Sequence, residues 1–200
     1  MKAARDDYEY HYPELAEALF HALREDAFYR TLESVSDAGA MRRYHDYSMR
    51  EAQAYGELTI HEDTGYGVEI WARPLAAERQ TDMSAAKKAF MLAHMNRASL
   101  EAYVAIGGWM LAQAEALVSP DAWYLSILGV VPAYQNRGLG ALLVQPVLAQ
   151  TDATGVPTYL ETFTPRNEAF YQRLGYRVAG RFHEPTTAAD YALMIREAAG

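Results

Sequence analysis

An apolar run that ends in a glycine-containing turn has the residue types needed to bind a phosphate group. Residues 123–131 read Trp-Tyr-Leu-Ser-Ile-Leu-Gly-Val-Val, a β-prone run, and Pro132 ends it because proline cannot donate to a sheet ladder. A polar turn follows, and then Gly138-Leu-Gly140 leads into a helical pattern. The first amides of a helix lack intrahelical partners, and glycines let a ligand approach them closely. The strand, turn and helix therefore predict a phosphate site, with a simple tight connection as the alternative.

The absence of two known motifs restricts which phosphate ligand this turn could bind. No Lys-Ser or Lys-Thr pair follows the glycines, so the P-loop pattern is absent. The dinucleotide pattern requires three spaced glycines and a later acidic residue, and here only Gly138 and Gly140 fit. An unrelated nucleotide-binding α/β protein is therefore a disfavoured alternative.

A second group of residues could move protons. Tyr171 follows Asn167 by one helical turn, so both side chains project from one face of a predicted helix over residues 165–175. A tyrosine hydroxyl can donate a proton to a leaving group. Thr164 and Pro165 are typical of the start of that helix and Gly175 of its end. A buried tyrosine with a packing role is the alternative for Tyr171.

Glu161 is the candidate base because it interrupts an otherwise apolar strand over residues 158–163. A carboxylate in such a strand is unusual unless it is paired or functional. It could accept a proton from an amine or bind an ammonium group. Pairing with Arg166 or Arg173 is an equally good interpretation. Glu69 is a weaker candidate, since its side chain could simply alternate outward from the hairpin.

Two ordered motifs resemble those of the GCN5-related N-acetyltransferases (GNAT). Residues 135–140, Gln-Asn-Arg-Gly-Leu-Gly, resemble the acyl-CoA-binding motif Gln/Arg-x-x-Gly-x-Gly/Ala of that superfamily. Residues 164–176, with Asn167, Phe-Tyr171 and Gly-Tyr176, resemble its second signature. The run 155–167 is similar to the puromycin N-acetyltransferase branch. Residues 121–200 carry nearly all of the resemblance, and the first 120 residues align only loosely.

The resemblance implies a mixed, V-splayed β-sheet that holds acetyl-CoA where two parallel strands separate. It also implies direct acetyl transfer to an amine, with Tyr171 as general acid and Asn167 as a cofactor or pocket ligand. The backbone at Gly129 would polarise the thioester carbonyl, and Arg137 could add positive charge. The expected cofactor-binding residues are Ile127, Leu128, Gly129, Val130, Gln135, Asn136, Arg137, Gly138, Leu139, Gly140 and Asn167.

Length and composition suit one globular domain, residues 1–200. Half of the residues are hydrophobic and 22% are charged, and the chain has no cysteine, which excludes disulfides, thiolate metal sites and a cysteine nucleophile. Met1 leads into charged residues and no apolar stretch is long enough to span a membrane, so we expect a cytoplasmic protein without membrane contact. The six histidines have no metal-ligand spacing, so we expect no metal.

The charge distribution bears on the partners. A net charge of −8 argues against nucleic-acid binding, which normally needs a basic surface. Residues 1–120 contain 12 basic and 19 acidic residues, whereas residues 121–200 contain 6 and 7. The acidic excess in the first half favours a cationic amine substrate, although ordinary solubilising surface charge is the commoner reason.

Hydrophobic periodicity places the motifs on an alternating set of strands and helices. The expected elements are, in order, a first strand within residues 1–12, a helix from Pro13, a helix over about 37–55, a hairpin of strands 57–61 and 66–72 turning at 62–65, a helical segment over about 75–120, a strand over 123–131, a helix over 138–150, a strand over 158–163, a helix over 165–175, and strands over 176–182 and 191–196.

Several details of these elements are open to test. We expect Asp82 to cap a helix, and the Gly107-Gly108 pair to mark close packing, a kink or a break, because each mid-helix glycine costs about 1 kcal/mol relative to alanine. In the helix over 138–150, Pro146 should cause a bend, and the residues expected to face inward are Leu139, Leu142, Leu143 and Val147. Four aromatic residues could line an acceptor pocket, although packing is the simpler interpretation; they are Phe28, Tyr29, Tyr44 and Tyr47.

The sequence thus predicts an α/β (α+β) fold in which residues 1–120 form an acceptor-side half, with a helical insertion over about 75–120, and residues 121–200 bind acetyl-CoA. The methionine-rich face of that insertion could form a substrate wall, a core or a subunit contact, so a homodimer is conceivable. The expected function is N-acetyltransfer to a primary amine of a small molecule, such as an antibiotic or aminonucleoside. The alternatives are a non-catalytic CoA-binding regulatory module and a transferase for peptide or protein α-amines or for a metabolic polyamine.

Overall fold

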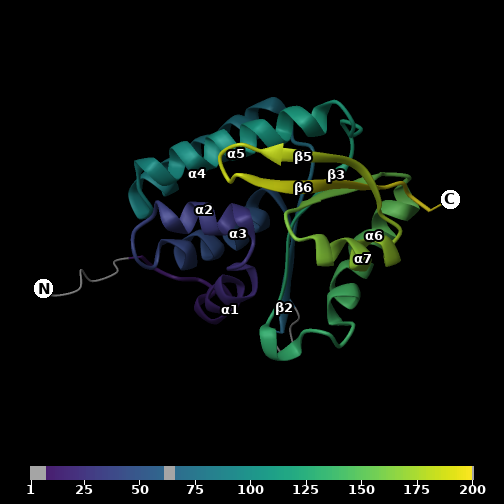
Figure 1. The fold of residues 1–200 in the computed structure, drawn as a ribbon, viewed down its shortest axis with the longest axis horizontal. Coiled ribbons are helices and arrows are strands. Elements are labelled where there is room, and N and C mark those ends of the chain that lie inside the picture. The colour runs from purple at the N-terminus through teal and green to yellow at the C-terminus, as the bar shows by residue number, and fades with distance from the viewer. Residues whose placement is uncertain (1–7, 61–65, 200) are drawn as a thin grey trace, which may run out of the picture.

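A mixed six-stranded sheet lies between two groups of helices (Figure 1). The computed structural model describes residues 8–60 and 66–199. Its elements are α1 (Pro13–Leu23), α2 (Ala27–Ser34), α3 (Ala40–Tyr55), β1 (Gly56–Ile60), β2 (Gly67–Ala72), α4 (Ala77–His94), α5 (Arg97–Glu115), β3 (Trp123–Val130), the short 3-10 helix η1 (Pro132–Tyr134), α6 (Leu139–Thr154), β4 (Thr158–Thr162), α7 (Pro165–Arg173), β5 (Arg177–Glu184) and β6 (Ala189–Arg196).

The strands are arranged in the order β1-β2-β3-β4-β6-β5, and β3 and β4 are the parallel neighbours. These two strands pair only at Trp123 with Thr158 and at Tyr124 with Tyr159. Beyond those residues each strand continues on its other edge, β3 against β2 and β4 against β6. Backbone groups on the inner edges of β3 and β4 therefore lack a ladder partner, and the sheet opens in the V that the family resemblance implies.

Both faces of the sheet are covered, because its strands alternate apolar side chains between them. Leu125 and Leu160 belong to a core with α6 and α7 on one face. Ile127 packs with α1 and α3 on the other face, and Leu193 packs there with α5. Helices α2, α3 and α4 form a further core around Met91.

A register shift in β3 changes which way its side chains point. Ile70 pairs with Ile127, but the next residue of β2, Trp71, pairs with Leu125, so Ser126 is the extra residue of a β-bulge. A bulge bends a strand and redirects its side chains. It lies where β3 has already left β4, and so contributes to the opening of the sheet.

Several local expectations are wrong. Residues 8–12 form no strand, while residues 1–7 and the turn expected at 62–65 lie outside the described residues. Helix α4 begins at Ala77, so Asp82 lies within the helix and does not cap it. Leu142 is 55% exposed, whereas Leu143 and Val147 are buried as expected, because the buried stripe of α6 continues through Val144 and Leu148 and leaves Leu142 outside it.

The Gly107-Gly108 pair neither breaks α5 nor marks close packing. The helix runs from Arg97 to Glu115, and no described heavy atom lies within 4 Å of the place that a Cβ would take at either glycine. The cost of two mid-helix glycines is therefore met by the packing of the rest of the helix, in which Ile106 and Met110 are buried. Pro146 does lie inside α6, as expected.

One buried carboxylate helps to attach the segment before α1 to the helices. Asp46, which is fully buried on α3, accepts hydrogen bonds from the Tyr8 hydroxyl (2.8 Å) and from the backbone N–H groups of His11 (2.9 Å) and Tyr12 (2.7 Å). We expect Asp46→Ala to lower the free energy of unfolding by about 3 kcal/mol, because buried donors lose their acceptor. Chemical denaturation would measure the loss.

Asp82→Ala is the matched control for that prediction, because Asp82 is an exposed helical aspartate. Its free energy of unfolding should stay within about 0.5 kcal/mol of the wild type. Equal losses in the two variants would mean that the Asp46 hydrogen bonds contribute nothing specific to the fold.

Candidate active site

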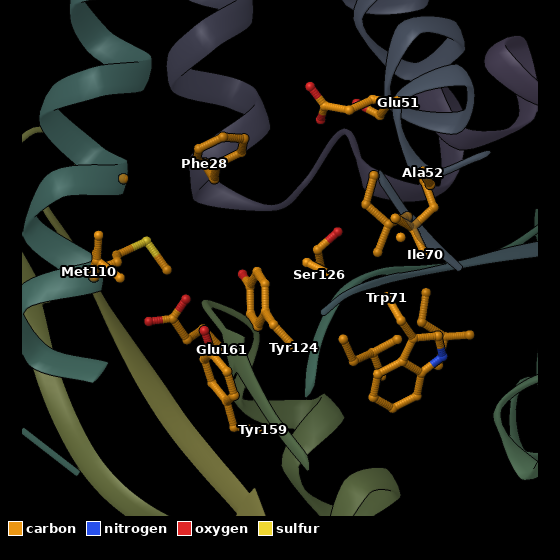
Figure 2. Close-up of a pocket in the computed structure, with 18 of the residues that line it drawn as sticks. Phe28, Glu51, Ala52, Ile70, Trp71, Met110, Tyr124, Ser126, Tyr159 and Glu161 are labelled. Atoms are coloured by element: carbon orange, nitrogen blue, oxygen red, sulfur yellow. The ribbon is translucent and has the colours of Figure 1, made fainter. Parts of the chain in front are cut away.

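A cavity of about 470 Å³ lies where β3 and β4 separate (Figure 2). Its size is within the range of small-ligand pockets. The walls come from α2, α3, α4 and α5 on one side, from β2, β3 and β4, and from α7 on the other side of the sheet. Segments far apart in the sequence thus meet at one space.

The opening of the sheet explains how α7 reaches this cavity. Helix α7 packs on β4 and β6, on the same face of the sheet as α6, and Tyr171 belongs to the hydrophobic core on that face. Asn167 and Tyr171 nevertheless line the cavity together with residues of α2 to α5. A continuous β3–β4 ladder would separate them from those helices. The predicted pair at one helical turn is therefore brought to the site by the V-shaped sheet.

Tyr171 is held as a neutral phenol. It is 9% exposed, and burial, followed by the nearby Tyr176 and Asp26, raises its pKa above the ordinary value of a tyrosine. Within the described ranges its hydroxyl has no hydrogen-bond partner, although it lines the cavity. The site thus presents a protonated hydroxyl that can donate to a ligand.

Glu161 faces the cavity from the α5 side of β4. Burial raises its pKa to about 7, and a hydrogen bond from Tyr124 offsets part of that rise. Among the residues that the structure describes, none bonds to the Glu161 Oε1 atom, and neither Arg166 nor Arg173 pairs with this carboxylate. The structural pairing considered from the sequence is therefore absent there, and Glu161 has the protonation behaviour of a base at neutral pH.

Glu69 is also buried, contrary to the expectation that it alternates outward. Its side chain is 0% exposed, its Oε2 accepts from the Trp71 indole N–H at 2.9 Å, and burial raises its pKa. It does not belong to the cavity lining, in which Glu161 lies. Both faces of the sheet are covered by helices, so neither direction from β2 leads to solvent.

Asp26 is a cavity residue that sequence reasoning missed. It precedes α2 and accepts from the Phe28 N–H at 3.0 Å, and burial raises its pKa to about 6. Its charge is close enough to affect the pKa of Tyr171. An N-cap aspartate is common, so nothing in the sequence separates this one from a purely structural cap.

Aromatic side chains dominate the acceptor-side wall. The rings of Tyr124 and Tyr159 stack with their centroids 4.8 Å apart. Three further aromatic residues line the cavity and also pack the helices together, so they have both of the roles considered from the sequence; they are Phe28, Tyr29 and Tyr44. On α3 the lining residues repeat at helical spacing, which is a signal that the sequence offered; they are Tyr44, Ser48, Glu51, Ala52 and Tyr55.

The backbone expected to bind acetyl-CoA begins at the cavity. Ile127 and Leu128 line it, whereas Gly129 and Val130 lie farther along β3, paired with Val68 and Gly67 of β2. Their other edge is the one that faces away from β2, toward the opening. This is the position at which a ligand with its own amides could replace the missing ladder.

The glycine turn, residues 135–140, lies between β3 and α6 and continues this candidate cofactor site. The Gln135 side-chain amide donates to Val130 O at 2.9 Å, and Asn136 and Gly138 take left-handed conformations with φ of 61° and 78°. In the described part of the chain the first α6 amide with a backbone partner is that of Ala141, which donates to Gly138 O at 3.1 Å. The amides of residues 136–140 are therefore available to an anion at a helix N-terminus.

Comparison with known proteins agrees with this geometry. The family model described as acetyltransferase (GNAT) domain matches residues 98–178, which include the glycine turn and the Asn167/Tyr171 pair. Among solved structures, arylalkylamine N-acetyltransferase 2 from Aedes aegypti has a TM-score of 0.62 at 9% identity, covering 94% of this chain and 95% of that one.

Two further structures are similar over nearly the whole chain. A protein from Corynebacterium glutamicum described as histone acetyltransferase HPA2 and related acetyltransferase has a TM-score of 0.58 at 16% identity, covering 100% of this chain and 96% of that one. Ard1 from Thermoplasma volcanium has a TM-score of 0.51 at 11% identity, with 94% of each chain covered. The chain thus has the mixed α/β fold of these structures, and residues 98–178 match the acetyltransferase (GNAT) domain model.

No helix within residues 8–60 and 66–199 is both long and apolar enough to cross a membrane.

Proposed function

We propose that this protein transfers an acetyl group from acetyl-CoA directly to a primary amine of a small molecule. One observation carries the proposal. A neutral tyrosine hydroxyl and a carboxyl group with a pKa near neutrality line one cavity at the point where two parallel strands separate. We further propose a single domain, with residues 1–120 as the acceptor side and residues 121–200 as the cofactor side.

The residues around the opening suit acetyl-CoA. The available amides of residues 136–140 would hold the pyrophosphate, and Arg137, whose guanidinium lies 5.5 Å from the ring centroid of Tyr134, would add positive charge. The edge of β3 at residues 127–130 would bond the pantetheine amides, and Asn167 would contact the cofactor from α7. Bound acetyl-CoA supplies an activated acyl group as a thioester.

The protein groups would then manage the protons. Glu161 would accept the proton of the acceptor amine, because a carboxylate with a pKa of about 7 is partly ionised at neutral pH. Tyr171 would donate to the departing sulfur, since its raised pKa keeps it protonated. A backbone N–H near Gly129 would stabilise the negative charge that develops on the carbonyl oxygen. This division of roles needs no covalent enzyme intermediate.

The acceptor side favours a small amine with an apolar body. Helices α2 to α5 enclose it, and its wall carries the stacked Tyr124 and Tyr159 together with Phe28. Aromatic surfaces bind rings and alkyl chains well. An aminonucleoside or another antibiotic amine fits this description, and the similarity of residues 155–167 to the puromycin N-acetyltransferase branch also favours it.

Calorimetric titration of acetyl-CoA, with a parallel thiol-release screen, tests the proposal. The screen compares antibiotic amines, arylalkylamines, polyamines and peptides. Binding together with release on a small amine is the expected result. Binding without release on any amine would indicate a regulatory module, release on peptides alone would indicate an α-amine transferase, and no binding would refute the proposal.

A further inference from the structure

A buried lysine lies in the wall of the acceptor cavity. Lys87 of α4 is 7% exposed, and its Nζ is 2.9 Å from Glu51 Oε2 on α3. The same Nζ lies over three tyrosine rings, 4.9 Å from the centroids of Tyr44 and Tyr47 and 5.7 Å from that of Tyr103. A carboxylate and aromatic ring faces together form a cation-binding site. In this protein the ammonium group of Lys87 occupies that site.

Lys87 keeps its positive charge in this position. Burial alone would lower its pKa, but the faces of the neighbouring tyrosine rings and the Glu51 carboxylate at 2.9 Å favour the charged form, and the pKa is raised. The pKa of Tyr44 is also raised, so that ring is neutral at working pH. In this part of the wall the charges of Lys87 and Glu51 therefore compensate each other.

Lys87 and Glu51 belong to the lining that also contains Glu161 and Tyr171. Figure 2 shows Glu51 and Glu161 well apart, with Phe28 between them in the view. An amine that reacts at Glu161 would thus extend its body toward Glu51 and Lys87. At that end Lys87 already balances the single negative charge of Glu51 through its Oε2 atom and lies over the tyrosine rings, whereas Glu51 Oε1 has no hydrogen-bond partner among the described residues.

Packing alone does not explain a lysine at this position. Lysine is almost never fully buried unless it is paired, and an apolar residue of similar volume is often as stable as a buried ion pair, or more so. On the same helix, Lys88 is exposed to solvent. A fixed charge in a binding wall acts on ligands through repulsion as well as attraction.

We propose that Lys87 makes the acceptor site selective for monoamines with an uncharged body and rejects diamines and polyamines. The proposal rests on the proposed function, because it identifies the substrate class of the same cavity. A second ammonium at the far end would lie beside Lys87, which already balances the charge of Glu51. Glu51 Oε1 could accept a hydrogen bond from a neutral group there, but a second positive charge would remain uncompensated, and like charges placed together in a poorly solvated site strongly oppose binding.

Equilibrium binding tests this without any turnover. Alkylamines and α,ω-diamines of matched length are titrated calorimetrically into the protein saturated with CoA, over a series of chain lengths. The wild type is expected to bind the best monoamine at least about tenfold more tightly than the matched diamine. In Lys87→Met the preference should reverse, because the freed Glu51 carboxylate and the tyrosine faces then accept the second ammonium.

Two further variants make the outcome decisive. Lys88→Met removes an exposed lysine from the same helix and should keep the wild-type preference. Lys87→Met/Glu51→Gln removes both buried charges and should give an intermediate ratio, even if Lys87→Met alone folds poorly. Equal affinities in the wild type, an unchanged ratio in both Lys87 variants, or no amine binding at all would overturn the proposal. Absent thiol release with a preserved binding preference would refute only the proposed function.

Discussion

Replacing Tyr171 by phenylalanine is expected to lower kcat about a hundredfold or more while leaving the fold intact. The reason is that the departing sulfur loses the hydroxyl positioned to protonate it. Because this hydroxyl has no hydrogen-bond partner within the described residues, its removal should change the free energy of unfolding by less than about 0.5 kcal/mol. Single-turnover thiol release and chemical denaturation measure the two effects.

Tyr176→Phe provides a matched control. Tyr176 is also buried near α7, but its hydroxyl bonds to Thr158 Oγ1 at 2.9 Å and it does not belong to the cavity lining. This variant should lose about 1–2 kcal/mol of stability, since Thr158 is left unpaired, and keep its kcat. A Tyr171→Phe enzyme with kcat within about threefold of the wild type would exclude Tyr171 as the acid.

Glu161→Gln is expected to remove the pH dependence that the wild type shows near neutrality. Because burial raises the pKa of Glu161 to about 7, the wild-type kcat/KM should rise with pH and level off above that value, as the carboxylate becomes available. The glutamine variant cannot accept the proton, so we expect its kcat/KM to be lower by about a hundredfold and not to rise with pH in this range. A pH–rate profile of both proteins measures the difference.

The same variant should also become the more stable protein at high pH. A carboxyl group with a folded-state pKa raised from 4.5 to about 7 contributes stability that is complete below the unfolded pKa and is lost as the pH rises through the folded pKa. Glutamine has no such loss. Between about pH 4 and pH 8 the variant should therefore gain as much as about 3 kcal/mol relative to the wild type.

Glu69→Gln separates the effect of a buried carboxyl group on stability from its effect on the pH dependence of the rate. Glu69 is buried and its pKa is raised, but it lies outside the cavity lining. Its replacement by glutamine should also make the protein more stable at high pH, but kcat/KM should still rise with pH as in the wild type. If kcat/KM of Glu161→Gln also rises with pH as in the wild type, the base is another group, and Asp26, with a pKa of about 6, becomes the first candidate.

The second half of the chain was predictable because its signals are local. A proline ends β3, glycines at 138 and 140 begin α6, and Thr164-Pro165 and Gly175 bracket α7, so each boundary depends on neighbouring residues. Asp82 shows the limit of such signals. It is a good capping residue type, yet α4 continues through it, because packing around Phe90 and Met91 matters more than one cap.

The site was predictable only in part, for a related reason. Tyr171, Asn167 and Glu161 stand out because each is a polar group in a regular, recognisable context. Asp26, Glu51 and Lys87 do not, since a capping aspartate and a helical Glu or Lys are ordinary surface residues in most sequences. Their burial depends on α2, α3 and α4 packing together over the sheet, which no local pattern encodes.

Sequence alone thus determined the order of strands and helices in residues 121–200, the glycine turn and the Asn167/Tyr171 pair, because these depend on spacing along the chain. The tertiary structure decided which charged groups are buried and where they meet. The separation of β3 from β4 after Tyr124 and Tyr159 lets α7 reach the same cavity as α2 to α5. Burial in that shared space sets the pKa of Glu161 and fixes Lys87 among tyrosines, because both effects arise from neighbours distant in sequence.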